Sequence, residues 1–130
     1  MIEFEKFGFD EFEGDLSKAA LTIQPELAKV TGKALLNIKR GAQRRAKAIG
    51  PHLRRLPYAI DYDVWTFGAQ VVGEVGANHA KAQGRLAWVP EFGTPTSAPH
   101  PIFRPEVDKE LPKWPEFAEK VAYDALGGGS

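Results

Sequence analysis

Histidines, paired aspartates and serines are the side chains of this sequence that could do chemistry. The histidines stand at His52, His79 and His100, and no two have the i, i+4 spacing with which a helix presents two metal ligands. The chain has no cysteine, which excludes disulfides, thiolate metal sites and thiol nucleophiles. We therefore interpret the three histidines as surface residues and expect no bound metal.

Asp61 and Asp63 are two residues apart, so a strand would place both carboxylates on one side. Such a pair can serve acid–base chemistry or bind a cation. Only Glu74 adds another acid nearby, and we interpret the pair as the polar face of a half-exposed strand. No serine stands in a Gly-x-Ser-x-Gly motif, and the glycines match neither a phosphate loop nor a dinucleotide fingerprint. We expect no enzymatic activity and no cofactor.

The first half of the chain contains the pattern of a long helix. Apolar residues recur in steps of three or four across 16–49, which is the period of one helix face. Pro25 should kink this helix or start a new one, and Gly50-Pro51 should end it. Residues 1–14 carry aromatic side chains among acids and predict an extended arm that leads into the helix.

The middle of the chain changes to the period of a strand. Alternation over 58–65 and again over 71–76, with Gly68 between them, predicts a β-hairpin or two meander strands. Residues 86–89 could form a third strand or a helical turn, and Pro90 would place such a strand at a sheet edge.

The C-terminal part should be an extended connector followed by a helix. Four prolines stiffen 93–105, and the last of them suits the first turn of a helix that should divide near 112–115. We predict one α+β domain over 1–126, with 127–130 as a flexible Gly/Ser tail. In this domain a long N-terminal helix and a C-terminal helix pack on a small antiparallel sheet of two to four strands.

Composition is that of a soluble globular protein. The chain has 130 residues, of which 43% are hydrophobic and 26% charged, enough for one buried core. No apolar run approaches the roughly 20 residues of a membrane span, and the acidic N-terminus is unlike a secretory signal. We expect a soluble protein that works in a cytoplasm without membrane contact.

Charge is unevenly distributed although the formal net charge is zero. Residues 1–26 hold seven acids and two bases, whereas 27–60 hold nine bases and no acid. Such a basic run can contact DNA phosphates, pair with acids of a neighbouring copy, or remain a solvated face. The candidate contact residues are Lys39, Arg40, Arg44, Arg45, Lys47, Arg54 and Arg55.

Residues 86–107 form a motif, which runs Leu-Ala-Trp-Val-Pro-Glu-Phe-Gly-Thr and, after a short loop, Pro-His-Pro-Ile-Phe-Arg-Pro-Glu-Val. Gly93 permits positive φ, so the chain can turn abruptly there, and Thr94 can bond its own backbone. Phe92 should be a large apolar anchor, and Glu91 should cap an amide or pair with an arginine. The motif is suited to placing surfaces and holds no catalytic machinery.

The motif resembles the signature of a family of small phage proteins known as neck, tail-completion or tail-component proteins. The likeness extends to a helix that ends in Ala46-Lys47 before Pro51, whereas His52-Leu53 stands where the family often has Thr-Gly. Another departure is Pro105-Glu106-Val107, where Pro-Ala-Leu is common. The motif residues that the resemblance assigns to an interface are Trp88, Glu91, Phe92, Gly93, Thr94, Pro99, Pro101, Phe103 and Pro105.

The resemblance implies a structural virion protein of a long-tailed double-stranded DNA phage. It would be assembled in the host bacterial cytoplasm and would act at the head–tail junction as a ring around the DNA channel, with six copies expected. Its partners would be itself, head-closure proteins, and tail-terminator or tail-tube proteins, with non-specific contact to duplex DNA. The alternatives are a tail-terminator ring, a non-specific DNA-binding module that uses the basic helix, and a small hydrolase.

Overall fold

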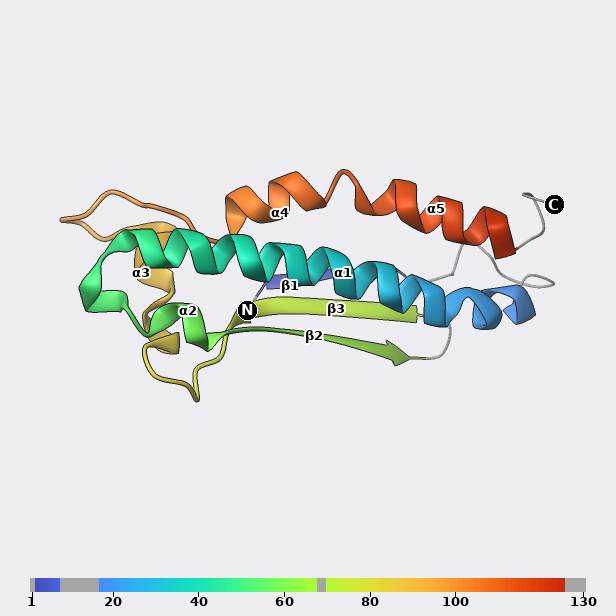
Figure 1. Ribbon diagram of the computed structural model, residues 1–130, viewed down its shortest axis with the longest axis horizontal. Helices are drawn as coiled ribbons and strands as arrows, with labels where there is room; N and C mark the ends of the chain where they lie inside the picture. Colours follow the sequence, from blue (N-terminus) through green and yellow to red (C-terminus); the bar gives the residue numbers. More distant parts are fainter. Residues whose placement is uncertain (1, 8–16, 68–69, 126–130) are drawn as a thin grey trace.

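The computed structural model describes residues 2–7, 17–67 and 70–125. Figure 1 shows α1 along the length of the molecule, with α4 and α5 in line on one side of it and the strands on the other. The elements in chain order are β1 (Ile2–Phe7), α1 (Ser17–Ile49), η3 (Pro51–Leu53), α2 (Leu56–Ala59), β2 (Ile60–Phe67), β3 (Gln70–Ala77), η4 (Gly84–Leu86), α3 (Trp88–Phe92), α4 (Arg104–Glu110) and α5 (Trp114–Ala125).

Helix α1 forms because its apolar positions make one continuous buried stripe. Ile23, Leu27, Leu35 and Ile38 are buried along it, and each such side chain stabilises the fold by about 1.5–3 kcal/mol. The helix continues through Pro25, so of the two expected alternatives, a kink or a new helix, the new helix was wrong. Pro25 lies on the exposed side, where water can bond the carbonyl that proline leaves unpaired.

The sheet has the strand order β1-β3-β2, and both pairings are antiparallel. The β2–β3 hairpin was predicted from the alternation, and β1 shows that residues 2–7 of the expected arm pair with β3. Helix α1 covers one face of the sheet, on which Val71 and Val75 are buried. Gly73 has Leu35 and Thr31 of α1 where a side chain would stand, so the glycine permits this close packing. Residues 8–14 of the arm and the tail 127–130 lie outside the described residues.

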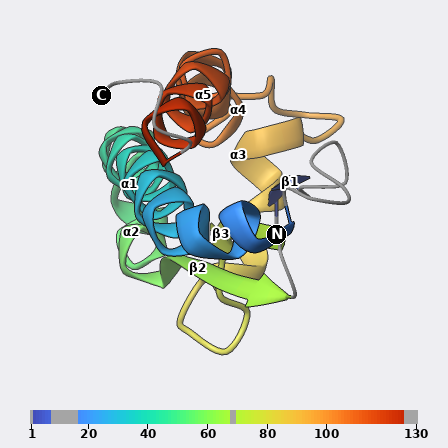
Figure 2. The ribbon, with the colours of Figure 1, turned by 90° about the vertical axis from the view of Figure 1, so that its right-hand side faces the viewer.

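Helices α4 and α5 pack along α1, as the end-on view in Figure 2 shows. The break between them at 111–113 falls where the prolines predicted it, and Pro105 stands in the first turn of α4. Buried Trp114 donates a hydrogen bond from its indole nitrogen to Thr31 Oγ1 over 2.9 Å. The predicted α+β fold, with a long N-terminal helix and a C-terminal helix packed on an antiparallel sheet, is confirmed.

Residues 86–89 do not form a strand. They lie in η4 and at the start of α3, so of the two alternatives the helical turn is confirmed and the edge strand was wrong. Pro90 is compatible with a first helical turn, where no amide donor is needed. None of the helices in the described part of the chain has the length and apolar character that crossing a bilayer requires.

Candidate interaction surfaces

Glu91 holds the two ends of the motif together. Its Oε1 accepts hydrogen bonds from the backbone amides of Ile102 and Phe103 over 3.0 and 2.9 Å, and its Oε2 accepts one from Arg104 over 3.1 Å. These amides lie at the start of α4, where a helix leaves donors unpaired and favours negative charge. Of the two roles expected for Glu91, amide capping is therefore confirmed.

The loop after Glu91 is fixed by its backbone. Gly93 has a φ of 75° and a ψ of −178°, a conformation that essentially only glycine adopts, which confirms the expectation for this residue. Thr94 and Ser97 exchange two backbone hydrogen bonds of 2.9 and 3.1 Å, and Thr94 Oγ1 accepts a third from the amide of Thr96 over 3.3 Å. The amide of His100 donates to the carbonyl of Pro90 over 2.7 Å, so the loop returns to α3.

Six of the motif residues meet around one cavity of about 670 Å³ at the Gly76 end of the sheet. The exposed fraction is 55% for Trp88 and 76% for Phe92, so Phe92, expected as a large apolar anchor, does not occupy the core of the single chain. Ile102 and Phe103, exposed by 0% and 5%, take that place because Glu91 fixes their backbone. The motif residues in the cavity wall are Trp88, Glu91, Phe92, Pro99, Pro101 and Phe103.

Pro105 belongs to a second, smaller hollow. It borders a cavity of about 440 Å³ together with Arg45, Pro99 and Pro101, between the end of α1 and the connector. Gly93 and Thr94 border neither cavity and act only through the loop that they shape. The structure therefore brings most of the predicted motif residues together, but on two sides of the proline connector.

Two of the predicted basic contact residues are already engaged within the chain. Arg45 Nε donates to the buried carboxylate of Glu106 over 2.9 Å, and Lys39 Nζ lies 5.7 Å from the centre of the Tyr62 ring. Both side chains point toward elements that pack on α1, so they are less available for an outside contact than the other predicted basic residues. The basic contact residues that remain exposed are Arg40, Arg44, Lys47, Arg54 and Arg55.

The face of the sheet turned away from α1 carries carboxylates and aromatic rings. Burial alone would raise the pKa of Asp61, but hydrogen bonds from Lys81 and Asn78 over 3.0 and 3.1 Å lower it below its ordinary value. Asp63 is exposed, and within the described part of the chain its carboxylate accepts only the amide of the next residue, Val64, over 2.9 Å. Asp61 and Asp63 therefore form part of the polar face of β2, and their carboxylates have different hydrogen-bond partners.

The remaining candidates for chemistry are dispersed. His52, His79 and His100 are all exposed, and among the described residues no group of three or more His, Asp or Glu side chains could hold a metal ion. Sequence reasoning missed Lys29 and Lys33, which are exposed on α1 and which the helical spacing could have revealed. The comparisons with known proteins found no matching family model, no matching curated protein and no matching solved structure.

Proposed function

We propose that this protein is a structural component of a long-tailed phage virion, which forms a ring at the head–tail junction and acts by binding other protein surfaces. The single observation that carries the proposal is the cavity that the motif residues build, because its wall is largely apolar and is flanked by exposed Trp88 and Phe92. Exposed aromatic side chains beside a preformed apolar hollow are typical of protein–protein interfaces. The resemblance of 86–107 to the neck and tail-completion family supplies the virion context.

The walls of the cavity favour binding over catalysis. The described residues that line it include no serine, threonine, cysteine or lysine, and His79 and Glu91 are the lining side chains that could act as a nucleophile or a base. Both oxygens of Glu91 already accept backbone amides, which leaves this carboxylate committed to holding the loop. What the cavity can do is receive an apolar side chain and order it against Trp88 and Phe92.

A tail-terminator ring would use the same surfaces, since it too depends on contacts between neighbouring copies. A DNA-binding module is a different candidate, favoured by the exposed bases of α1. The proposals differ in what associates: a ring protein associates with itself in the absence of DNA, whereas the module stays monomeric and binds random duplex in a salt-dependent way.

Oligomeric state tests the proposal directly. We expect mass photometry and negative-stain microscopy of the purified chain to show closed rings. The double variant Trp88→Ser/Phe92→Ser should give mainly smaller species with an unchanged melting temperature, because both side chains are exposed in the single chain. Phe117→Ser/Tyr123→Ser removes two comparably exposed aromatic side chains from α5 and should leave the ring oligomer intact. A chain that stays monomeric at every concentration but retains duplex DNA would instead support the DNA-binding module.

A further inference from the structure

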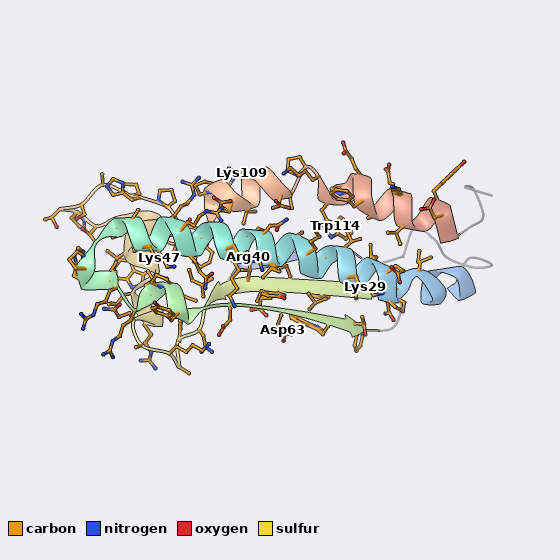
Figure 3. The ribbon with its side chains drawn as sticks, viewed as in Figure 1. Lys29, Arg40, Lys47, Asp63, Lys109 and Trp114 are labelled. Carbon is orange, nitrogen blue, oxygen red and sulfur yellow. The ribbon has the colours of Figure 1, made fainter. Side chains whose placement is uncertain are left out.

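The outward side of α1 is a continuous basic stripe. Its five exposed bases fall at steps of 4, 7, 4 and 3 residues, close to multiples of the helical period, and span about 27 Å at roughly 1.5 Å per residue. Figure 3 shows Lys29, Arg40 and Lys47 spread along the helix. Only Lys29 has an ion-pair partner among the described residues, Glu26 at 3.1 Å. This α1 ridge consists of Lys29, Lys33, Arg40, Arg44 and Lys47.

The side of the sheet turned away from α1 presents an acidic and aromatic surface. Asp63, Trp65 and Phe67 alternate along β2 with residues that face α1, so they share the far side of the sheet, where Figure 3 shows Asp63. All three are exposed, with Trp65 at 41% and Phe67 at 74%. Half-buried Glu74 stands directly across from Asp63 in the register. These four residues are named the outer sheet face.

Like charges that face each other across two strands destabilise a sheet unless a cation lies between them. Neither Asp63 nor Glu74 has such a cation among the described residues, whereas Asp61 on the same strand has Lys81 at 3.0 Å. Exposed aromatic rings beside unpaired carboxylates are suited to guanidinium groups, which pair with carboxylates and stack on ring faces. The chemistry that completes the outer sheet face is therefore a row of bases, with arginine preferred.

A single chain cannot bring its two surfaces together. The residues of α1 that contact the sheet lie on the inner side of the helix, where a side chain at Gly73 would meet Leu35. The α1 ridge is on the side of that helix that faces solvent, and the outer sheet face is on the side of the sheet turned away from α1, so the two surfaces point in different directions. Two different, complementary patches associate head to tail, and such a heterologous contact closes a ring where the rotation between neighbouring copies brings the last copy back to the first.

We infer that the α1 ridge of one copy docks on the outer sheet face of the next copy. This inference rests on the proposed function, because it identifies the two surfaces of the ring contact. Charge complementarity within one sequence of formal net charge zero favours a second copy over DNA, since a protein devoted to DNA is typically basic as a whole. The cavity at the Gly76 end of the same sheet extends this contact and receives apolar side chains.

Charge reversal on each surface tests the contact. We expect Asp63→Lys and the pair Arg40→Glu/Arg44→Glu each to weaken association roughly tenfold or more at about 0.1 M salt, because several exposed ion pairs become repulsive together. Combining the two sets should recover part of the lost association, since the base introduced at position 63 can pair with the acids introduced at positions 40 and 44. Glu119→Lys and Lys120→Glu reverse exposed charges on α5 and serve as matched controls that should change nothing.

The readouts are sedimentation velocity for association, circular dichroism for folding, and retention of random duplex DNA on filters. Variants that fold and still form rings with unchanged affinity would overturn the inference and leave the proposed ring standing. Loss of DNA retention in Arg40→Glu/Arg44→Glu with intact rings would overturn it in favour of DNA on the ridge. An unmodified chain that remains monomeric at every concentration would remove both the inference and the proposed function.

Discussion

The carboxylate of Glu106 lies directly against Gly41, where any side chain on residue 41 would overlap it. This contact sets how closely α4 approaches α1. Glu106 is buried there and accepts hydrogen bonds from Arg45 over 2.9 Å and from Lys109 over 3.4 Å. The glycine thus makes room for a charged network that joins residues 61 positions apart in the sequence.

Two glycines of α1 should respond to alanine in opposite directions. Gly41→Ala should lower the free energy of unfolding by about 1–3 kcal/mol, because the new methyl group displaces Glu106 from its partners. Gly32→Ala should raise it by about 0.5–1 kcal/mol, since its nearest atom, Val64 Cγ2, would be 3.8 Å away and alanine favours the helix. Urea denaturation of both variants measures the difference. Equal effects would show that the Glu106 contact does not restrict residue 41.

Acid should selectively weaken the Glu106 network. Burial alone would raise the pKa of Glu106, but hydrogen bonds and charges of Arg45 and Lys109 lower it below its ordinary value of 4.5. Because the folded-state pKa lies below the unfolded one, the stabilisation is fully present above about pH 5.5 and is lost as pH falls from 4.5 through the folded value. The stability difference between the original chain and Glu106→Gln should therefore be constant near neutral pH and shrink below pH 4.5. A difference that is unchanged at pH 3 would contradict this.

Local sequence patterns predicted the helices and strands, but they could not predict contacts between residues that are far apart in the sequence. The helical period and the Gly50-Pro51 stop located α1, because both signals lie within the segment that they shape. The tertiary burial of Ile23 and Leu27 keeps α1 in one piece through Pro25, and this burial could not be foreseen from local sequence.

The candidate site could be predicted only in part, because some of its contacts join residues that are far apart in the sequence. Gly93 and Glu91 act within the motif, so their backbone roles could be foreseen from the local sequence. Arg45 could not be separated from the other bases, because its partner Glu106 stands on a helix that only the tertiary fold brings near. The exposure of Phe92 likewise depends on which side of α3 faces the core, and five residues carry too little periodicity to decide that.

Glu91 should be the main support of the motif loop. Glu91→Ala should cost about 2–3 kcal/mol of stability, because amides of Ile102 and Phe103 lose their acceptor in a part-buried place. Hydrogen exchange should report faster exchange at these two amides, with α1 unaffected. Glu119→Ala, which removes an exposed carboxylate from α5, is the control and should change neither quantity. Unchanged exchange at residues 102 and 103 would show that the loop holds without this carboxylate.

We expect that no side chain can be introduced at position 93 without strain. A Cβ there would stand 2.7 Å from the carbonyl oxygen of Ser97 and 2.9 Å from the nitrogen of Pro99, on a backbone with φ of 75°. We expect Gly93→Val to lower the stability by about 1–3 kcal/mol or to displace the loop and impair assembly. Thr96→Val introduces a β-branched apolar residue in the same loop at an exposed position and should be nearly neutral. A melting temperature and an oligomer unchanged by Gly93→Val would contradict the requirement for glycine.

Adjacent arginines on α1 should separate folding from association. Arg45→Glu places a second carboxylate against buried Glu106, so it should lower the free energy of unfolding by about 1–3 kcal/mol, an amount moderated by the partial exposure of Arg45. Arg44→Glu changes an exposed residue of the α1 ridge and should leave the melting temperature unchanged while weakening association. Thermal unfolding at low protein concentration, where the chain is monomeric, measures the change in stability. Sedimentation velocity at high concentration measures the change in association. The prediction fails if both variants unfold at the same temperature, because the two charges would then be equivalent and the Arg45–Glu106 pair would not support the packing of α4 on α1.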